Sequence, residues 1–180
     1  GNACPECKRV YRRTGTPGYT GKMSVRTVNA EEMRELMERE FPAGRSIVLT
    51  VTGHSMSPTL SHLRDQVYLT SPQRRKPRRG EIVFFQRKDG TCILHRIIKE
   101  EGNWFVINGD SQTWTEVISR DQVLGVAEGI VRNGRYISCN SPVYRAYVFL
   151  WRMMKPVRGL IVKTVAFVKK CRNQKRAGIG

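Results

Sequence analysis

Short strand-like runs separated by turn residues fill the middle of this chain, and they constrain its fold more than any other feature. Branched and aromatic residues form these runs, and glycine-containing pairs such as Asp89-Gly90, Gly102-Asn103 and Asn133-Gly134 punctuate them. The expected strands cover residues 46–52, 65–69, 80–85, 92–98, 104–107, 122–127, 129–132 and 135–137. The pattern predicts a mainly β unit over residues 45–138, built as a bent antiparallel sheet or partly closed barrel.

The segments before this unit differ from it in composition. Residues 1–28 are polar and basic with scattered Gly and Pro, which predicts a loose basic leader in which Met23 could be a natural start. Residues 29–44 predict a short amphipathic helix, because Asn29 can cap it, Glu32 stands three residues on, and apolar residues recur at helical spacing. We expect this helix to pack over the edge of the core.

Basic residues are concentrated after the β unit. The chain has a formal net charge of +17, which implies an anionic partner, and residues 142–180 hold ten Lys or Arg and no Asp or Glu. Residues 139–180 therefore predict a basic amphipathic helical tail, in two segments because Pro156 and Gly159 interrupt it.

An anionic membrane surface is the expected partner of this tail. On a helix Arg145, Arg152, Lys163 and Lys170 align on one face, and large apolar residues such as Trp151 occupy much of the rest. Nucleic acid explains the charge but not the apolar residues, and a helix packed on the β unit with its charges in water is the alternative.

The sequence shows neither a membrane-spanning segment nor an export signal. No apolar run approaches the roughly 20 residues that cross a bilayer, and the first thirty residues lack the apolar stretch of a signal peptide. A peripheral membrane protein on the cytoplasmic face is the default expectation.

The spacing of the cysteines predicts no particular cofactor. Cys4-Pro-Glu-Cys7 has metal-ligand spacing, but no second pair or nearby histidine completes four ligands, and five cysteines are too sparse for a disulfide framework. We expect neither a metal nor another cofactor, and a reducing compartment is favoured.

Ser55 is the candidate nucleophile. It lies in residues 51–60, where a strand-like run breaks at Gly53 and a turn is set by Pro58, so that its hydroxyl can be held on rigid backbone at a strand end. A serine hydroxyl needs a base to take its proton. Without such a base the segment is only a serine-rich turn.

The base must come from three histidines. His54 neighbours Ser55 on extended backbone, so the two side chains point to opposite faces, and His62 is expected at the surface. His95 lies within an apolar strand with Arg96 on the opposite face, where an unpaired imidazole is costly. A buried, hydrogen-bonded histidine of the core is the alternative interpretation of His95.

Four segments in order resemble the S24/S26 superfamily of serine peptidases, which includes type I signal peptidases and LexA-like self-cleaving repressors. They are residues 53–60, similar to its serine box; residues 79–83, similar to the box that follows; residues 95–98, similar to its base box; and Asn108-Gly109-Asp110, similar to its Gly-Asp box. The resemblance covers about residues 45–137. Most bacterial and LexA-like members have lysine as the base, whereas here His95 stands forty positions after Ser55, as in signal peptidases of the endoplasmic-reticulum and archaeal type.

The resemblance implies a Ser55–His95 pair with an acidic third member. Asp110 is the first choice, Glu116 the second and Asp121 the third. His95 would take the Ser55 proton during attack on a peptide carbonyl and return it to the leaving amine. The Ser55 backbone N–H would be one oxyanion donor, while Gly53 stands where many signal peptidases have a hydroxyl, a gap that Thr52 could fill.

The sequence therefore predicts a serine endopeptidase that binds an extended, leader-type segment of a protein substrate as an added strand and cleaves after a small residue. Two alternatives stay open: a LexA-like regulator that cuts itself, and a catalytically inactive basic protein that binds membrane or nucleic acid. Signal peptidases carry a spanning helix before the serine box, whereas this chain has only the short helix after Asn29. The basic tail is expected to take over that anchoring role.

Overall fold

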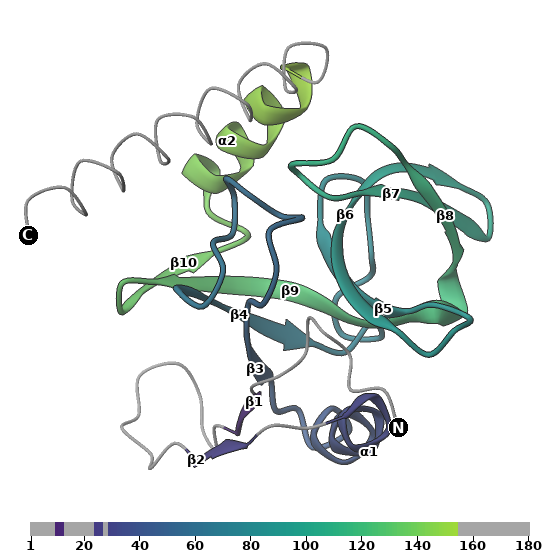
Figure 1. Cartoon of the computed structure of the whole chain (residues 1–180), viewed down its shortest axis with the longest axis vertical. Coiled ribbons are helices and arrows are strands. Elements are labelled where there is room, and N and C mark those ends of the chain that lie inside the picture. Colours follow the sequence, from purple (N-terminus) through teal and green to yellow (C-terminus); the bar gives the residue numbers. More distant parts are fainter. Residues whose placement is uncertain (1–9, 13–23, 27–28, 155–180) are drawn as a thin grey trace, which may run out of the picture.

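The computed structural model describes residues 10–12, 24–26 and 29–154 (Figure 1). Within them, one antiparallel sheet is flanked by a helix near each end of the chain. The strands are β1 Val10–Arg12, β2 Ser24–Arg26, β3 Ile47–Thr50, β4 Asp65–Thr70, β5 Ile82–Gln86, β6 Cys92–Glu101, β7 Trp104–Asn108, β8 Glu116–Ser119, β9 Val123–Arg132 and β10 Arg135–Ser138. The helices are α1 Ala30–Glu40, the short 3-10 helix η1 Arg120–Gln122 and α2 Pro142–Met153.

The sheet runs in the order β2-β1-β3-β4-β9-β5-β6-β7-β8, and β10 pairs with β9. All of the described pairings are antiparallel. Figure 1 shows β5 to β8 curling into a ring on one side, while the long strand β9 joins that ring to β4 and β3. The predicted mainly β architecture, a bent and partly closed antiparallel sheet, is confirmed.

Both faces of the curled sheet are buried, and this explains why several strands are apolar throughout. Along β5, Val83 and Phe85 join one cluster inside the ring, whereas Ile82 and Phe84 join a second cluster under α1. Successive side chains of a strand point to opposite faces, so a strand with two buried faces carries no alternation of polar residues. The sequence pattern of a continuous apolar run follows directly.

Helix α1 begins as its capping signals predict. The Asn29 side chain accepts from the Glu32 N–H at 2.9 Å, and the Glu32 carboxylate accepts from the Asn29 N–H at 3.0 Å, which completes a capping box. Met33 and Met37 lie fully within the core below the sheet. The helix ends at Glu40, four residues before the predicted boundary at Gly44.

Three strands were missed by the sequence analysis. β1 and β2 lie within the stretch predicted to be a loose leader, where β1 pairs with both β2 and β3 and so extends the sheet. The expectation of a loose leader is therefore wrong for residues 10–12 and 24–26. β8 is only four residues long and follows a polar loop, so it has too short an apolar run to be recognised. The two strands predicted at 122–127 and 129–132 form the single strand β9.

Helix α2 begins the predicted tail. Ser141 caps it by accepting from the Tyr144 N–H at 3.2 Å, and Pro142 occupies its first turn, where a missing N–H costs nothing. In Figure 1 it lies across the molecule from α1, above the loop that joins β3 to β4. The expected second helical segment, with Lys163 and Lys170, lies outside the described residues.

Candidate active site

Ser55 lies in the loop between β3 and β4, and its surroundings hold that loop on both sides. Gly53 has a φ of 105°, a conformation that favours glycine, and its N–H donates to His62 Nδ1 at 2.9 Å. The side chains of Met56 and Leu60, which follow Ser55, are buried in the core. The glycine turn predicted before the serine is therefore present, and the half-buried Ser55 sits on anchored backbone.

The far end of this loop is fixed by a buried carboxylate. Asp65, at the start of β4, is fully buried and accepts from the Ser61 N–H at 2.9 Å and from the Arg132 guanidinium at 3.0 Å. Arg132 in turn donates to the Thr59 carbonyl. Although burial alone would raise the pKa of Asp65, hydrogen bonds from Arg64 and Arg132 lower it, so this clamp is charged at neutral pH.

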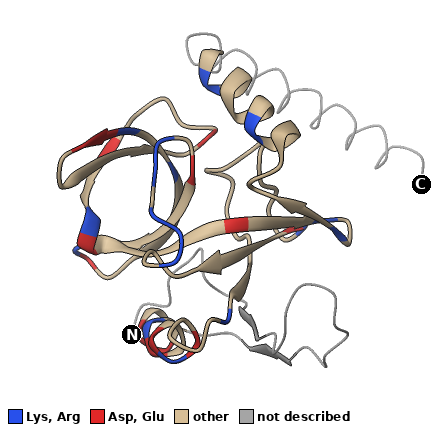
Figure 2. Cartoon of the chain, turned by 180° about the vertical axis from the view of Figure 1, so that it is seen from behind, with Lys and Arg blue, Asp and Glu red and all other residues tan. Residues whose placement is uncertain are grey.

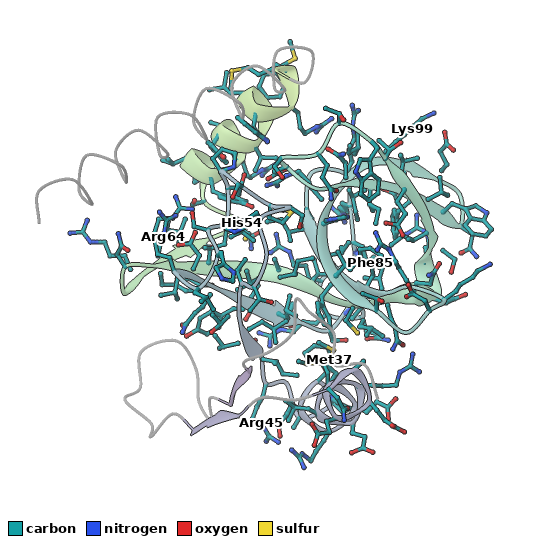
Figure 3. The ribbon with its side chains drawn as sticks, in the orientation of Figure 1. Met37, Arg45, His54, Arg64, Phe85 and Lys99 are labelled. Carbon is teal, nitrogen blue, oxygen red and sulfur yellow. The ribbon has the colours of Figure 1, made fainter. Side chains whose placement is uncertain are left out.

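His95 stands on β6 directly opposite Val83 of β5. Its imidazole therefore points into the apolar interior enclosed by strands β5 to β8. The side chain is 1% exposed and packs between Phe85, at 6.0 Å between ring centroids, and Trp114, at 6.2 Å. Figure 3 labels Phe85 in that interior. Arg96 lies opposite Ile82, on the other face, as the alternation of the strand predicts.

Burial moves the pKa of the His95 imidazole well below its ordinary value. Desolvation lowers the pKa of His95 to about 4; Glu116 and Asp110 act against that shift, and Arg87 adds to it. The ring is consequently neutral at pH 7, the form that accepts a proton. Its Nδ1 atom is buried and makes no hydrogen bond to any described residue.

The loop between β7 and β8 connects the surroundings of the two side chains. At its start, the Ser111 N–H and hydroxyl both donate to the Ser55 carbonyl at 2.9 Å, and the hydroxyl also reaches the His54 carbonyl. Gly109 lies so close that a Cβ there would stand 2.6 Å from the Ser55 carbonyl oxygen. Three residues after Ser111, the ring of Trp114 meets His95 edge-on. One short loop therefore touches both Ser55 and His95.

The acids expected to orient His95 have other partners. Asp110 is buried, and its two carboxylate oxygens accept from Arg96 at 2.9 and 2.6 Å. Burial by itself would lower the pKa of Arg96, but the Asp110 charge and hydrogen bonds raise it, so this pair stays ionised. Glu116 accepts from Arg87 at 2.6 Å through both oxygens. In the described part of the chain, neither carboxylate hydrogen-bonds His95.

This geometry corrects the expected third member. Asp110 joins the Gly-Asp box to the base box through Arg96 and not through His95, because the bidentate guanidinium occupies both of its oxygens. Among the acids, Glu116, the second choice from the sequence, raises the pKa of His95 the most. Asp121 lies in η1 beside a different cavity, one shared with α1.

A family model described as Peptidase S24-like matches residues 19–129, which include Ser55, His95 and the loop that touches both. This chain belongs to the peptidase S24-like family. The matched range spans the segments that resemble the serine box, the base box and the Gly-Asp box. No curated protein matches the chain.

Several residues that support this S24-like site carried no recognisable signal. Ser111 follows the Gly-Asp box, but nothing local indicates that it would bond to residues more than fifty positions away. His62 was expected at the surface, and it is exposed, yet its Nδ1 accepts the Gly53 N–H. His54 is exposed as well, with its ring 5.1 Å from that of His62, and Figure 3 labels it in the loop beneath α2.

Helix α2 of this S24-like chain packs against the serine loop and the base box. The Tyr147 hydroxyl bonds to the Thr59 hydroxyl at 2.9 Å, and the Tyr144 hydroxyl lies 3.5 Å from an Arg96 nitrogen. Trp151 was expected to contact a membrane, but it is 3% exposed and stacks on Tyr147 at 6.4 Å with an angle of 11°. That expectation is wrong for Trp151, because its ring faces the protein.

The described residues contain no candidate metal site and no candidate membrane-spanning helix. No group of three or more His, Cys, Asp or Glu side chains in them is arranged to hold a metal ion, and Cys92 and Cys139 are buried thiols. Cys4 and Cys7 lie outside that part of the chain. None of the described helices is both long and apolar enough to cross a membrane.

Proposed function

We propose that this S24-like protein is a serine endopeptidase in which Ser55 attacks the scissile carbonyl and His95 acts as the general base. The observation that carries the proposal is the 109–115 loop, which hydrogen-bonds the Ser55 backbone through Ser111 and packs Trp114 against the His95 ring. Membership of the peptidase S24-like family supports the serine peptidase part of this proposal.

The base in this proposal works as a neutral imidazole held by packing. His95 takes the Ser55 proton as the hydroxyl oxygen bonds to the carbonyl carbon, and returns that proton to the amine when the C–N bond breaks. Water then attacks the carbonyl of the acyl-enzyme and loses a proton to His95, and that proton passes to Ser55 Oγ as the ester C–O bond breaks and the carboxyl product leaves. Glu116 favours the imidazolium that forms in each step, because its charge raises the pKa of His95.

The proposed substrate is an extended, leader-type segment of a protein, bound as an added strand and cut after a small residue, as in signal peptidases with a Ser-His site. Trp114 supports a substrate position next to the base, because its ring is 49% exposed while its edge meets the buried His95. A half-exposed indole offers apolar area to one substrate side chain.

Cleavage of leader-type peptides by matched serine variants tests the proposal. Ser55→Ala should abolish cleavage, whereas Ser57→Ala, two residues along the same loop, should retain it. Ser57 is a suitable control because its hydroxyl makes only a long contact of 3.5 Å to the Leu60 carbonyl. Circular dichroism and thermal unfolding establish that both variants fold. Undiminished cleavage by Ser55→Ala would refute the proposal.

A LexA-like protein that cuts its own chain is the second candidate, and the match to the peptidase S24-like model favours it. In contrast, LexA-like proteins use lysine as the base where this chain has His95. Incubating the purified protein and weighing the products by mass spectrometry separates the two. A self-generated fragment that disappears in Ser55→Ala, without cleavage of added peptides, would establish the regulator.

A further inference from the structure

The basic loop at residues 74–79, which joins β4 to β5, forms one wall of a cavity beneath α2. A loop rich in Lys and Arg is most often a solvated turn, but this one faces the helix across a space of about 370 Å³. Figure 2, seen from behind, shows the Lys and Arg positions of the loop in blue and two blue bands on α2. Residues some seventy positions apart thus line one cavity.

The cavity carries a large excess of positive charge. Its lining includes five arginines, Arg75, Arg78, Arg79, Arg145 and Arg152. The one carboxylate among its lining residues, Glu81, is paired with Arg75 at 2.9 Å. The other four arginines make no ion pair with a described residue. An anionic ligand would neutralise this cluster.

Two groups in the cluster have surroundings that an anion would suit. The pKa of Arg152 is lowered by burial first and then by the neighbouring charges of Arg79 and Arg96. The Nε atom of Arg75 is buried and has no hydrogen-bond partner among the described residues. Guanidinium groups held close together with donors to spare are suited to phosphate oxygens.

Exposed apolar side chains adjoin the cavity. Phe149 lines it and is 61% exposed, while Leu150 and Met153 of the same helix are 59% and 66% exposed. A soluble phosphate would use the arginines and leave these side chains in water. A phospholipid in a membrane contacts both groups. Its phosphate lies at the membrane surface, where the arginines can bind it, and apolar side chains enter the membrane at that same depth.

We propose that the arginine cavity beneath α2 binds the phosphate of an anionic phospholipid, with Phe149, Leu150 and Met153 in the interface of the same membrane. The proposal goes beyond the peptidase function and does not depend on it. Because Tyr147 of α2 bonds to Thr59 of the serine loop, such binding would hold the candidate active site close to the membrane surface.

Vesicle binding of the full chain tests the site. Phosphatidylcholine vesicles with and without phosphatidylglycerol are used as probes, and Ser55→Ala is the background so that cleavage plays no part. The double variant Arg78→Gln/Arg79→Gln should bind the anionic vesicles at least about tenfold more weakly, since each basic residue near such a surface contributes appreciably. Lys88→Gln/Arg135→Gln removes the same charge elsewhere and should lose much less.

A second pair of measurements distinguishes the ligand sources. Phe149→Ser should weaken vesicle binding while leaving binding of glycerol phosphate unchanged. The proposal is overturned if both double variants lose affinity equally, since net charge would then suffice. It is also overturned if Phe149→Ser has no effect on vesicles, or if the cavity variant loses binding to duplex DNA while the protein ignores vesicles.

Discussion

The buried imidazole of His95 makes a quantitative prediction about stability and pH. Its pKa is about 4 in the folded protein and about 6.5 when the chain is unfolded. Since the unfolded state binds the proton more tightly, protonation between these values favours unfolding. The resulting loss in the free energy of unfolding is absent well above pH 6.5, grows as the pH falls and reaches its full size below about pH 4.

The magnitude follows from the difference between the two pKa values. A difference of ~2.5 units corresponds to a limiting ~3 kcal/mol, of which ~2 kcal/mol is already present at pH 5. Urea unfolding of the wild type and of His95→Gln at pH 7, 6, 5 and 4 isolates this contribution, because other titrating groups are common to both. The wild type should lose ~2 kcal/mol relative to the variant between pH 7 and pH 5.

The exposed His54 provides the matched control. His54→Gln should stay within ~0.5 kcal/mol of the wild type at every pH, as expected of a solvent-exposed substitution. If the difference between wild type and His95→Gln changes by less than ~0.5 kcal/mol over the range, His95 is not buried as described. The assignment of a neutral, packed base would then fail.

Three further variants test the surroundings of the site. Asp110→Asn should lower the free energy of unfolding by ~3–5 kcal/mol, because it leaves the buried Arg96 without its anion; a loss below ~1 kcal/mol in urea unfolding would contradict this. Gly109→Ala should reduce kcat about tenfold or more in peptide cleavage, since its Cβ would stand 2.6 Å from the Ser55 carbonyl oxygen, and unchanged turnover would argue against the loop as a support. Trp114→Ala should uncover the base, so its pKa should rise toward the ordinary value and the acid limb of kcat/KM should move to higher pH; a profile identical to the wild type would rule out this covering role.

The proposed arrangement relates the packing of α2 to the chemistry. Tyr147 connects the helix to the serine loop, and Tyr144 lies beside Arg96 of the base box. Movement of α2 at a membrane would therefore displace both the serine loop and the base box. The buried Trp151, stacked on Tyr147, keeps the helix on the protein while its opposite face stays exposed.

Local patterns predicted most strands of the β unit, and they placed Ser55 after a glycine turn and His95 within an apolar strand. The alternation of β6 places His95 and Arg96 on opposite faces, and the glycine turn before Ser55 needs only the φ angle that Gly53 adopts. β8 escaped prediction because its short run carries little periodic signal.

Tertiary structure decided which charged groups meet. Asp110 pairs with Arg96 and Glu116 with Arg87, although the sequence alone made either carboxylate a reasonable partner for His95. The loop at 74–79 lines one cavity with α2, and Trp151 turns inward. Residue spacing indicates the type of a single element and which face of it is buried, whereas the pairing of side chains distant in sequence depends on how the curled sheet brings those elements together.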